Sequence, residues 1–197
     1  RSDTVTGVQT CALPIWDAQL AHYAAELVDK RKEYLEMLAP LAQEKHAYLT
    51  DNAEKLEISA EKCYGKNAME TEQALFAELS YNYERDIRLG FTASGPHRDY
   101  IKVLIDGVEA RVYGSQGQTR TAALAVKLAE VEIFRQISGE YPVLILDDVI
   151  SELDLSRRKK LIGKIDGIQT ILTCTHTEKV LYGKECNKIR IANGKII

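Results

Sequence analysis

The chain has 197 residues, of which 45% are hydrophobic and 28% charged, and its formal net charge is −3 at pH 7. This composition is typical of a globular protein with one core or two small ones. The chain has no excess of basic residues, so a contact with nucleic acid would need a local basic patch or a segment outside this sequence. No apolar run approaches the roughly 20 residues that cross a bilayer, and the four cysteines form no C-x-x-C pair. We therefore expect reduced thiols, no membrane contact and a cytoplasmic location.

Residues 1–15 are predicted to be foreign to the fold. The stretch 5–15 reads VTGVQTCALPI, which resembles the translation of a common sequencing adapter. A segment of that origin is left out of fold reasoning, and it implies that the preceding half of the protein was cut away. The alternative is a native N-terminal strand.

Residues 16–89 are predicted to form a helical arm. Over 16–48, apolar side chains recur every three or four positions with charges between them, which indicates an amphipathic helix with a candidate kink at Pro40. The polar stretch 50–67 predicts a loop with a short helix or strand. A second helix is predicted over 68–89 and is expected to pack antiparallel to the first. Its apolar face carries Phe76, Leu79, Tyr83 and Ile87.

The pattern changes to alternation after Gly90. Two alternating runs, 101–105 and 108–112, are separated by Asp106 and Gly107. A two-residue Asp-Gly link favours a β-hairpin, because both turn positions need positive φ.

The remainder of the chain predicts an α/β order. A loop over 114–118 leads into a long helix that ends near Ser138 and Gly139. The unbroken apolar run 143–146 is typical of a strand buried on both faces of a parallel sheet. The remaining elements are predicted as a helix over 154–165, a buried strand over 170–173 and a hairpin at Asn193 and Gly194.

Four short polar features follow one another in the second half of the chain: SQGQ at 115–118, LILDD at 144–148, SELD at 151–154 and TH at 175–176. In the first, free N–H groups at a helix start favour a bound phosphate, to which Ser115 could add a hydroxyl. Taken alone, a Ser/Gly helix cap without a ligand is the commoner explanation.

The second feature places two carboxylates after an apolar strand, where open α/β sheets bind ligands. Asp147 is a candidate Mg²⁺ ligand, direct or through water, and Asp148 a candidate general base for an attacking water. A plain polar turn is the alternative. Asp154 suits a helix N-cap on either view. His176 could contact a γ-phosphate or be an exposed loop histidine, and the basic run 157–160 favours a solvated helix face over a DNA contact.

Together these residues resemble a known family. The stretches GPHRDYIKVLIDGVEARVYGSQGQTRTAALAVKLAEVEI and PVLILDDVISELDLSRRKKL are similar to the RecF family of ABC/SMC-like ATPases. The resemblance implies an α/β fold: the C-terminal part of an ABC-type (P-loop NTPase) head over 90–197, with the helical arm subdomain over 16–89. It implies a signature loop of Ser115, Gln116, Gly117 and Gln118, a Walker B pair of Asp147 and Asp148, a D-loop over 151–154 that includes Asp154, and a switch histidine at His176.

The resemblance also implies a function. It implies ATP and Mg²⁺ as cofactors, an ATP-dependent homodimer, and DNA binding at single-strand gaps or single-strand/double-strand junctions in recombinational repair and replication restart, in cooperation with RecO and RecR. The phosphate-binding sequence G-x-x-x-x-G-K-[ST] does not occur in these 197 residues, so the chain alone is predicted to be inactive. The alternatives are an SMC- or RecN-type head, a transporter ATPase, and a non-enzymatic α/β binding module. The short, interrupted helical region disfavours the SMC and RecN types.

Overall fold

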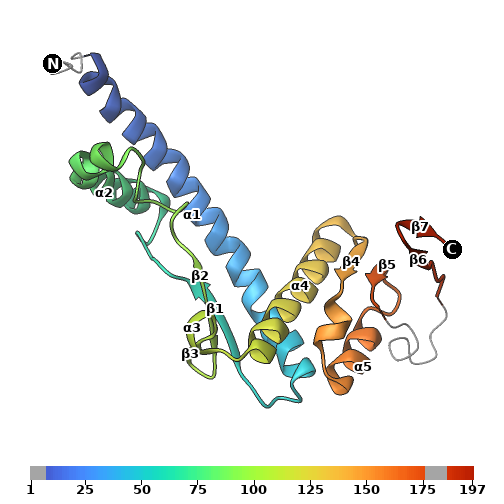
Figure 1. Cartoon of the computed structure of the whole chain (residues 1–197). Coiled ribbons are helices and arrows are strands. Elements are labelled where there is room, and N and C mark those ends of the chain that lie inside the picture. Colours follow the sequence, from blue (N-terminus) through green and yellow to red (C-terminus); the bar gives the residue numbers. More distant parts are fainter. Residues whose placement is uncertain (1–7, 176–185) are drawn as a thin grey trace.

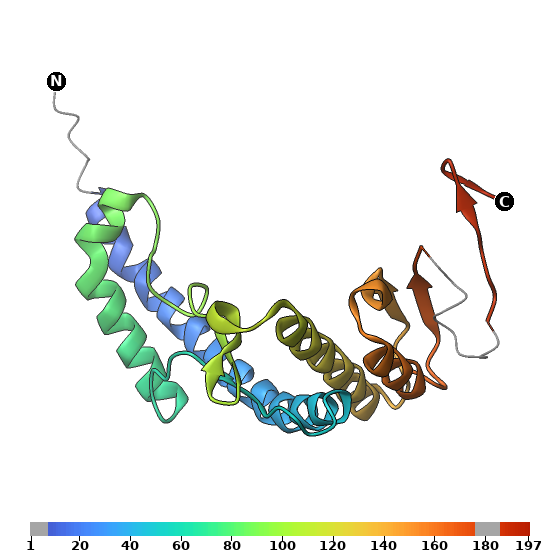
Figure 2. The ribbon, with the colours of Figure 1, turned by 60° about the horizontal axis from the view of Figure 1, so that its bottom comes forward.

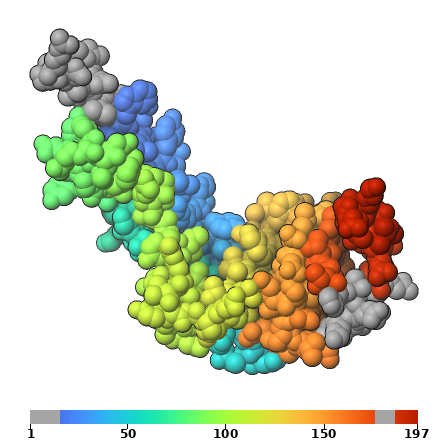
Figure 3. Space-filling model, in the orientation of Figure 1, coloured from blue at the N-terminus to red at the C-terminus, as the bar shows by residue number. Residues whose placement is uncertain are grey.

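A computed structural model describes residues 8–175 and 186–197, with side chains from Trp16 onward. The chain forms a helical arm that projects from a mixed α/β part (Figure 1). The space-filling view shows the same division between the arm and the bulkier α/β part (Figure 3). None of the helices in the described part of the chain combines the length and the apolar character that crossing a membrane needs.

The arm consists of α1 (Val8–Leu49) and α2 (Ala68–Leu89), which lie side by side (Figure 2). The helix α1 continues through Pro40 without interruption. The helix α2 begins at an Asn67 N-cap, whose side chain accepts from the N–H of Glu70, and it ends at Gly90 with a φ of 74°. Positive φ at this position is what favours glycine after a helix. Both predicted helices are therefore confirmed.

A narrow apolar stripe joins the two arm helices. Its buried members are Ala21 and Ala24 from α1 and Leu75 and Leu79 from α2. The predicted face of α2 is right at Leu79 but wrong at two other positions, because Phe76 is 39% and Ile87 56% exposed. The small side chains of α1 leave room for one row of α2 side chains, Leu75 and Leu79, which are four residues apart. The α2 positions next to this row face outward.

The segment that reads GPHRD connects the arm to the strand that follows. The backbone carbonyl of Pro96 accepts from the guanidinium of Arg31 at 2.9 Å. The carboxylate of Asp99, 4% exposed, accepts from the hydroxyl of Tyr64 at 2.6 Å. Burial raises the pKa of Tyr64, and the hydrogen bond to Asp99 adds to this. The described contacts of Pro96 and Asp99 are thus internal links between arm and sheet.

A three-stranded antiparallel sheet lies where the arm meets the α/β part, in the order β1-β2-β3. The strand β1 (Leu56–Ala60) pairs with β2 (Ile101–Ile105), which pairs in turn with β3 (Val108–Glu109). The turn residues Asp106 and Gly107 have φ of 50° and 79°, which confirms the predicted hairpin.

The second strand of this hairpin is shorter than predicted. A one-turn helix, α3 (Ala110–Tyr113), begins where the alternation was expected to continue to residue 112. Ala110 is buried whereas Val112 is 61% exposed. The apolar alternation therefore does not reflect burial on one face of a strand, and the chain turns toward the next helix instead.

The main core lies between the second half of α1 and α4 (Gln116–Ser138). The helix α4 ends at Gly139, whose φ is 82°, as predicted from the Ser-Gly pair. Strand β4 (Leu144–Asp147) and helix α5 (Leu155–Lys164) complete this core from the other side. Its fully buried members include Ala42, Leu49, Leu56, Ala125, Ala129, Ile150 and Leu161.

The second sheet is parallel, as predicted. The strand β4 pairs with β5 (Thr170–Thr173) in the register Leu144↔Thr170 to Asp147↔Thr173. The two are connected through the 3₁₀ turn η1 (Val149–Glu152) and α5. Leu144 and Leu146 face the core, but Ile145 is 66% exposed. The prediction of strands buried on both faces is wrong for the described chain, because helices cover one face of this sheet and leave the other open.

A last hairpin closes the described chain. Strands β6 (Ile191–Ala192) and β7 (Lys195–Ile196) pair antiparallel around Asn193 and Gly194. These turn residues have φ of 51° and 73°, as the Asn-Gly link predicts.

Candidate functional site

The predicted signature residues form the first turn of α4. Ser115 is the N-cap: its hydroxyl accepts from the N–H of Gln118 at 3.2 Å, and the side-chain oxygen of Gln118 accepts from the N–H of Ser115 at 2.9 Å. This reciprocal pair is a capping box. The predicted loop is therefore too long, because Gln116, Gly117 and Gln118 are already helical. Among the described residues, no hydrogen bond is formed by the N–H groups of Gln116 and Gly117, as expected in a first helical turn.

Gly117 is not required by the fold of this chain. Its φ is not positive, and an added Cβ would meet its nearest neighbour, an Arg157 guanidinium nitrogen, at an ordinary 3.6 Å. A glycine that neither the backbone nor the packing needs leaves room for close approach by something outside the described chain.

The predicted D-loop lies beside the start of α4. Arg120, one turn into α4, forms an ion pair with Glu152 at 2.7 Å. Asp154 caps α5 by accepting from the N–H of Arg157 at 2.9 Å, and its other oxygen lies 3.4 Å from the guanidinium of Arg157. The segments 115–120 and 151–157 thus form one continuous surface. The capping role predicted for Asp154 is confirmed, while its role toward a nucleotide stays a prediction.

The basic run 157–160 is largely engaged within the chain. Arg158 donates to the carbonyl of Leu153 at 2.6 Å. Lys160 lies 2.6 Å from a carboxylate oxygen of Asp51 and donates to the carbonyl of Leu49 at 3.2 Å. The expectation of a solvated helix face is wrong for these side chains, which tie α5 to the D-loop and to the end of α1.

The two predicted Walker B carboxylates are brought together with one residue that the sequence reasoning missed. The Thr173 hydroxyl donates to Asp147 at 2.5 Å and accepts from the N–H of Asp148 at 3.0 Å. Ser151 donates to a carboxylate oxygen of Asp148 at 2.8 Å, and Asp148 has a φ of 51°. The signal for Thr173 was its place as the last residue of the second parallel strand, in register with Asp147.

Asp147 and Thr173 bring hard oxygen atoms to the carboxyl end of a parallel pair of strands, and both are exposed. Such oxygens fit Mg²⁺, which usually keeps several waters and takes one or two protein carboxylates. Within residues 8–175 and 186–197, no three metal-binding side chains gather into a cluster. These two side chains alone would leave most of the ligand positions of such an ion to water, and magnesium binding by Asp147 stays a prediction. His176 lies outside the described residues, so its predicted role has no structural description.

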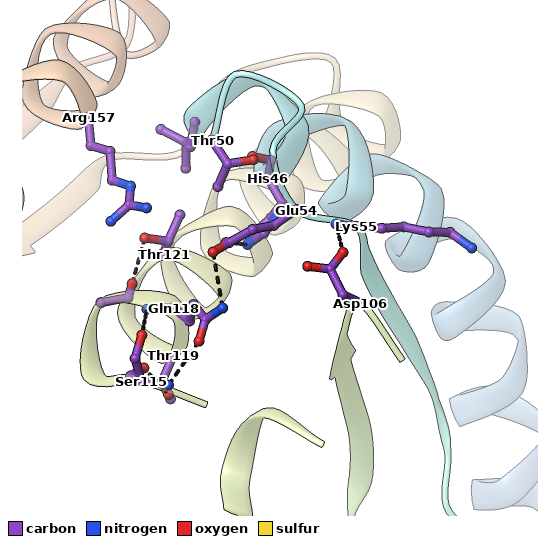
Figure 4. Close-up of polar contacts among 12 residues, drawn as sticks. His46, Thr50, Glu54, Lys55, Asp106, Ser115, Gln118, Thr119, Thr121 and Arg157 are labelled. Carbon is purple, nitrogen blue, oxygen red and sulfur yellow. Dashed lines mark hydrogen bonds and ion pairs between the residues drawn. The ribbon is translucent and has the colours of Figure 1, made fainter. Parts of the chain in front are cut away.

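Gln118 also contacts the end of the arm. Its amide nitrogen donates to Glu54 at 3.1 Å, and Glu54 lies 3.7 Å from the buried His46 (Figure 4). Neither Glu54 nor His46 was singled out from the sequence. His46 occupies an apolar-face position of a predicted helix, where a histidine gives no distinct signal.

This geometry defines a class of protein. A parallel pair of strands ends in two carboxylates, and the predicted D-loop follows beside the predicted signature helix. This arrangement is consistent with part of an ABC-type ATPase head. No protein-family model matches the chain, but individual proteins do.

The chain is 44% identical over 172 residues to the DNA replication and repair protein RecF of Lachnoclostridium phytofermentans. This match covers 87% of the chain and 46% of that relative. It is 40% identical over 190 residues to RecF of Clostridium botulinum strain Langeland, covering 93% of the chain and 51% of the relative.

Solved structures agree with these relatives. The recombination mediator protein RecF-ATPrS in the RecFOR pathway superposes with a TM-score of 0.82 at 36% identity, covering 98% of this chain and 52% of that one. The RecF-ATP structure gives a TM-score of 0.78 at 38% identity, covering 94% and 51%. The chain belongs to the RecF family, and the resemblance read from the sequence is confirmed. It spans about half the length of the curated relatives it matches.

Proposed function

We propose that the protein is an ATP-dependent DNA-binding protein of recombinational repair and replication restart, acting at single-strand gaps. In this proposal the chain contributes the signature loop, the Walker B strand and the D-loop of the ATP site. The observation that carries it is the meeting of Asp147, Asp148 and Thr173 at the carboxyl end of the parallel strands. The relatives are DNA replication and repair proteins of the RecF family, which supports the same biological role.

The residues at the strand ends have distinct proposed tasks. Bound Mg²⁺ would neutralise charge on the phosphates. Asp147 would hold that ion with its free carboxylate oxygen, while Thr173 fixes the orientation of the carboxylate by a hydrogen bond. Asp148 would accept a proton from the attacking water, and the Ser151 hydroxyl keeps this carboxylate in place.

The signature loop is proposed to act on a nucleotide held by a second copy of the protein. The N–H groups of Gln116 and Gly117 lie at the positive end of the α4 dipole, where an anion is favoured. Gly117 allows that approach because no Cβ stands in the way. The adjoining segment 151–154 would lie at the same dimer interface, since Arg120 and Glu152 join the two loops into one surface.

A phosphate-binding loop is proposed to come from a part of the protein outside these 197 residues. Such a sequence is absent here, and the relatives are about twice as long. The open face of the second sheet, where Ile145 and Ile171 are 66% and 54% exposed, is of the kind that a further structural layer covers in α/β proteins.

The partners follow from the same proposal. DNA at single-strand gaps or single-strand/double-strand junctions would be the substrate, and RecO and RecR the protein partners, in the cytoplasm. Support comes from the matching structures, which are described as RecF in the RecFOR pathway.

Variants of the full-length protein test the proposal. Asp148→Asn is expected to abolish ATP hydrolysis and to keep ATP-dependent dimerisation, because asparagine tolerates the positive φ of 51° at this position. Ser115→Arg is expected to block dimerisation by filling the space before α4. Glu36→Gln, a neutralised carboxylate on the exposed side of α1, is the control. Normal turnover in Asp148→Asn would remove the general-base role. If the wild-type protein stays monomeric both with and without ATP, the proposal of an ATP site shared between two copies fails.

A further inference from the structure

Buried polar side chains gather where the arm ends and α4 begins (Figure 4). His46 and Thr121 are both 0% exposed, and the side chain of Glu54 is 18% exposed. Both ring nitrogens of His46 and one carboxylate oxygen of Glu54 are buried without a hydrogen-bond partner among the described residues. Buried polar atoms without partners cost stability, so this cluster is a place where the chain gives up stability.

The amide of Gln118 is held at both ends in this cluster. Its oxygen accepts from the N–H of Ser115 at 2.9 Å, and its nitrogen donates to Glu54 at 3.1 Å. An ionised carboxylate only accepts hydrogen bonds. Glu54 therefore selects the amide nitrogen, and this leaves the oxygen for Ser115. With the amide turned over, both hydrogen bonds would be lost.

Glu54 itself comes from a firmly held turn. Asp51 and Asn52 have φ of 56° and 60°, so the chain reverses tightly at the end of α1. Asp51 is bound by Lys160 of α5 at 2.6 Å. On the other side of Glu54, the N–H of Lys55 donates to the Asp106 carboxylate at 2.8 Å. The position of Glu54 is thus set by α1, α5 and the β2-β3 turn together.

We infer that Glu54 is a positioning residue for the signature loop, which fixes the Gln118 amide and through it the Ser115 cap. This inference rests on the proposed function, because it concerns the surface proposed to close on ATP. Its consequence is a direct link between arm and ATP site. A displacement of the end of α1 moves Glu54, and Gln118 is the first group of the signature loop to respond.

Dimerisation of the full-length protein in the presence of ATP gives the first test. Glu54→Ala removes the acceptor for Gln118 and is expected to weaken ATP-dependent dimerisation about tenfold, the effect of one hydrogen bond to a charged group. Glu54→Gln keeps an oxygen acceptor and is expected to recover most of that loss. Glu57→Ala is the matched control, because Glu57 lies three residues on, is exposed and pairs with Lys55 instead. Equal effects of Glu54→Ala and Glu57→Ala would overturn the inference.

Hydrogen exchange at the Ser115 amide, measured without nucleotide, gives a test that does not depend on the proposed function. Exchange is expected to quicken about tenfold in Glu54→Ala and to stay near the wild-type rate in Glu54→Gln. Gln118→Glu should also quicken it, because two carboxylates would then face each other. Adding Glu54→Gln to Gln118→Glu should restore protection, since an amide again meets a carboxylate. If the wild type fails to dimerise with ATP, the proposed function fails while this exchange pattern still holds. Unchanged exchange in Glu54→Ala would overturn the positioning role.

Discussion

Thr173 and Asp147 face each other at the ends of two parallel strands, and the Thr173 hydroxyl donates to the Asp147 carboxylate at 2.5 Å. The same hydroxyl oxygen accepts from the N–H of Asp148 at 3.0 Å. One side chain of β5 therefore sets the direction of one carboxylate and the backbone of the next. The orientation of the proposed Walker B pair depends on the neighbouring strand as well as on its own.

Thr173→Val should remove the contacts of residue 173 with Asp147 and Asp148 and change the side-chain volume little. Both hydrogen bonds are lost, but Thr173 and Asp147 are exposed and water can take their place, so we expect the free energy of unfolding of the chain to fall by no more than about 1 kcal/mol. In the full-length protein, ATP hydrolysis should fall by roughly tenfold or more, as for other groups that orient a metal-binding carboxylate. Thr173→Ser retains the hydroxyl and should stay near wild type in both measurements. Equal losses in the two variants would contradict the prediction, because serine keeps the hydroxyl that both hydrogen bonds need.

Gly114→Ala should disturb the entry into α4 for a steric reason. An added Cβ would lie 2.5 Å from the carbonyl oxygen of Ala110, well inside contact distance, so the backbone before Ser115 must shift. Overpacking of this kind costs about 1–3 kcal/mol. Gly163→Ala is the control in α5, where the nearest atom is the Tyr48 hydroxyl at 3.7 Å and alanine should stabilise the helix by up to about 1 kcal/mol. Denaturant unfolding should show a lower free energy of unfolding for Gly114→Ala and an unchanged or higher one for Gly163→Ala. A lower value for both variants would contradict the prediction.

His46→Leu should reduce the acid sensitivity of the fold. Burial lowers the pKa of His46 below its usual 6.5, and the Glu54 carboxylate only partly offsets this. Below pH 6.5 the unfolded chain therefore binds a proton that the folded chain resists, and stability falls as the pH falls. The wild type should lose up to about 1.4 kcal/mol from this group between pH 7.5 and 5.5.

The comparison of His46→Leu with the wild type isolates this histidine, because the other titrating groups are common to both. His22, whose pKa is raised by its hydrogen bond to Glu72, acts in the opposite direction in both proteins. Unfolding curves at the two pH values give the difference. A variant that loses as much stability on acidification as the wild type would rule out His46 as the source.

Local chemistry made much of this fold predictable. Positive φ occurs in the turns at Asp106-Gly107 and Asn193-Gly194 and at the helix end at Gly139. Glycine, asparagine and aspartate are the residues that favour positive φ, so these features could be predicted from the sequence. The Asp154 cap and the parallel pairing of β4 and β5 also follow from local pattern. The candidate site was predictable as far as its residues are consecutive in sequence, as in 115–118 and 147–148.

What escaped prediction depends on contacts between distant segments. Phe76 and Ile87 have the right spacing for a buried face, but the small side chains of α1 decide which row is covered. The contact of Glu54 with Gln118 across 64 positions has no sequence signal, because hydrogen-bond partners of this kind are set by packing. For Thr173 the only signal was its place at the end of the second parallel strand, and that place does not show that its hydroxyl contacts Asp147. The open face of β4 was missed because an apolar run carries no information about how many layers the described chain supplies.

The 197-residue chain alone should not turn over ATP. Its carboxylates and signature residues supply partial contacts to the phosphates, but no lysine-bearing cradle of N–H groups is present in the sequence, and such a cradle provides most of the phosphate contacts in this class. Calorimetric titration with Mg-ATP should give no tight binding, and phosphate release should stay at the level of a no-protein blank. The full-length protein, measured in parallel, should release phosphate in an Asp148-dependent manner. Phosphate release by the isolated chain that Asp148→Asn removes would mean that these residues form a sufficient ATP site by themselves, and the division of the site between two parts of the protein would have to be abandoned.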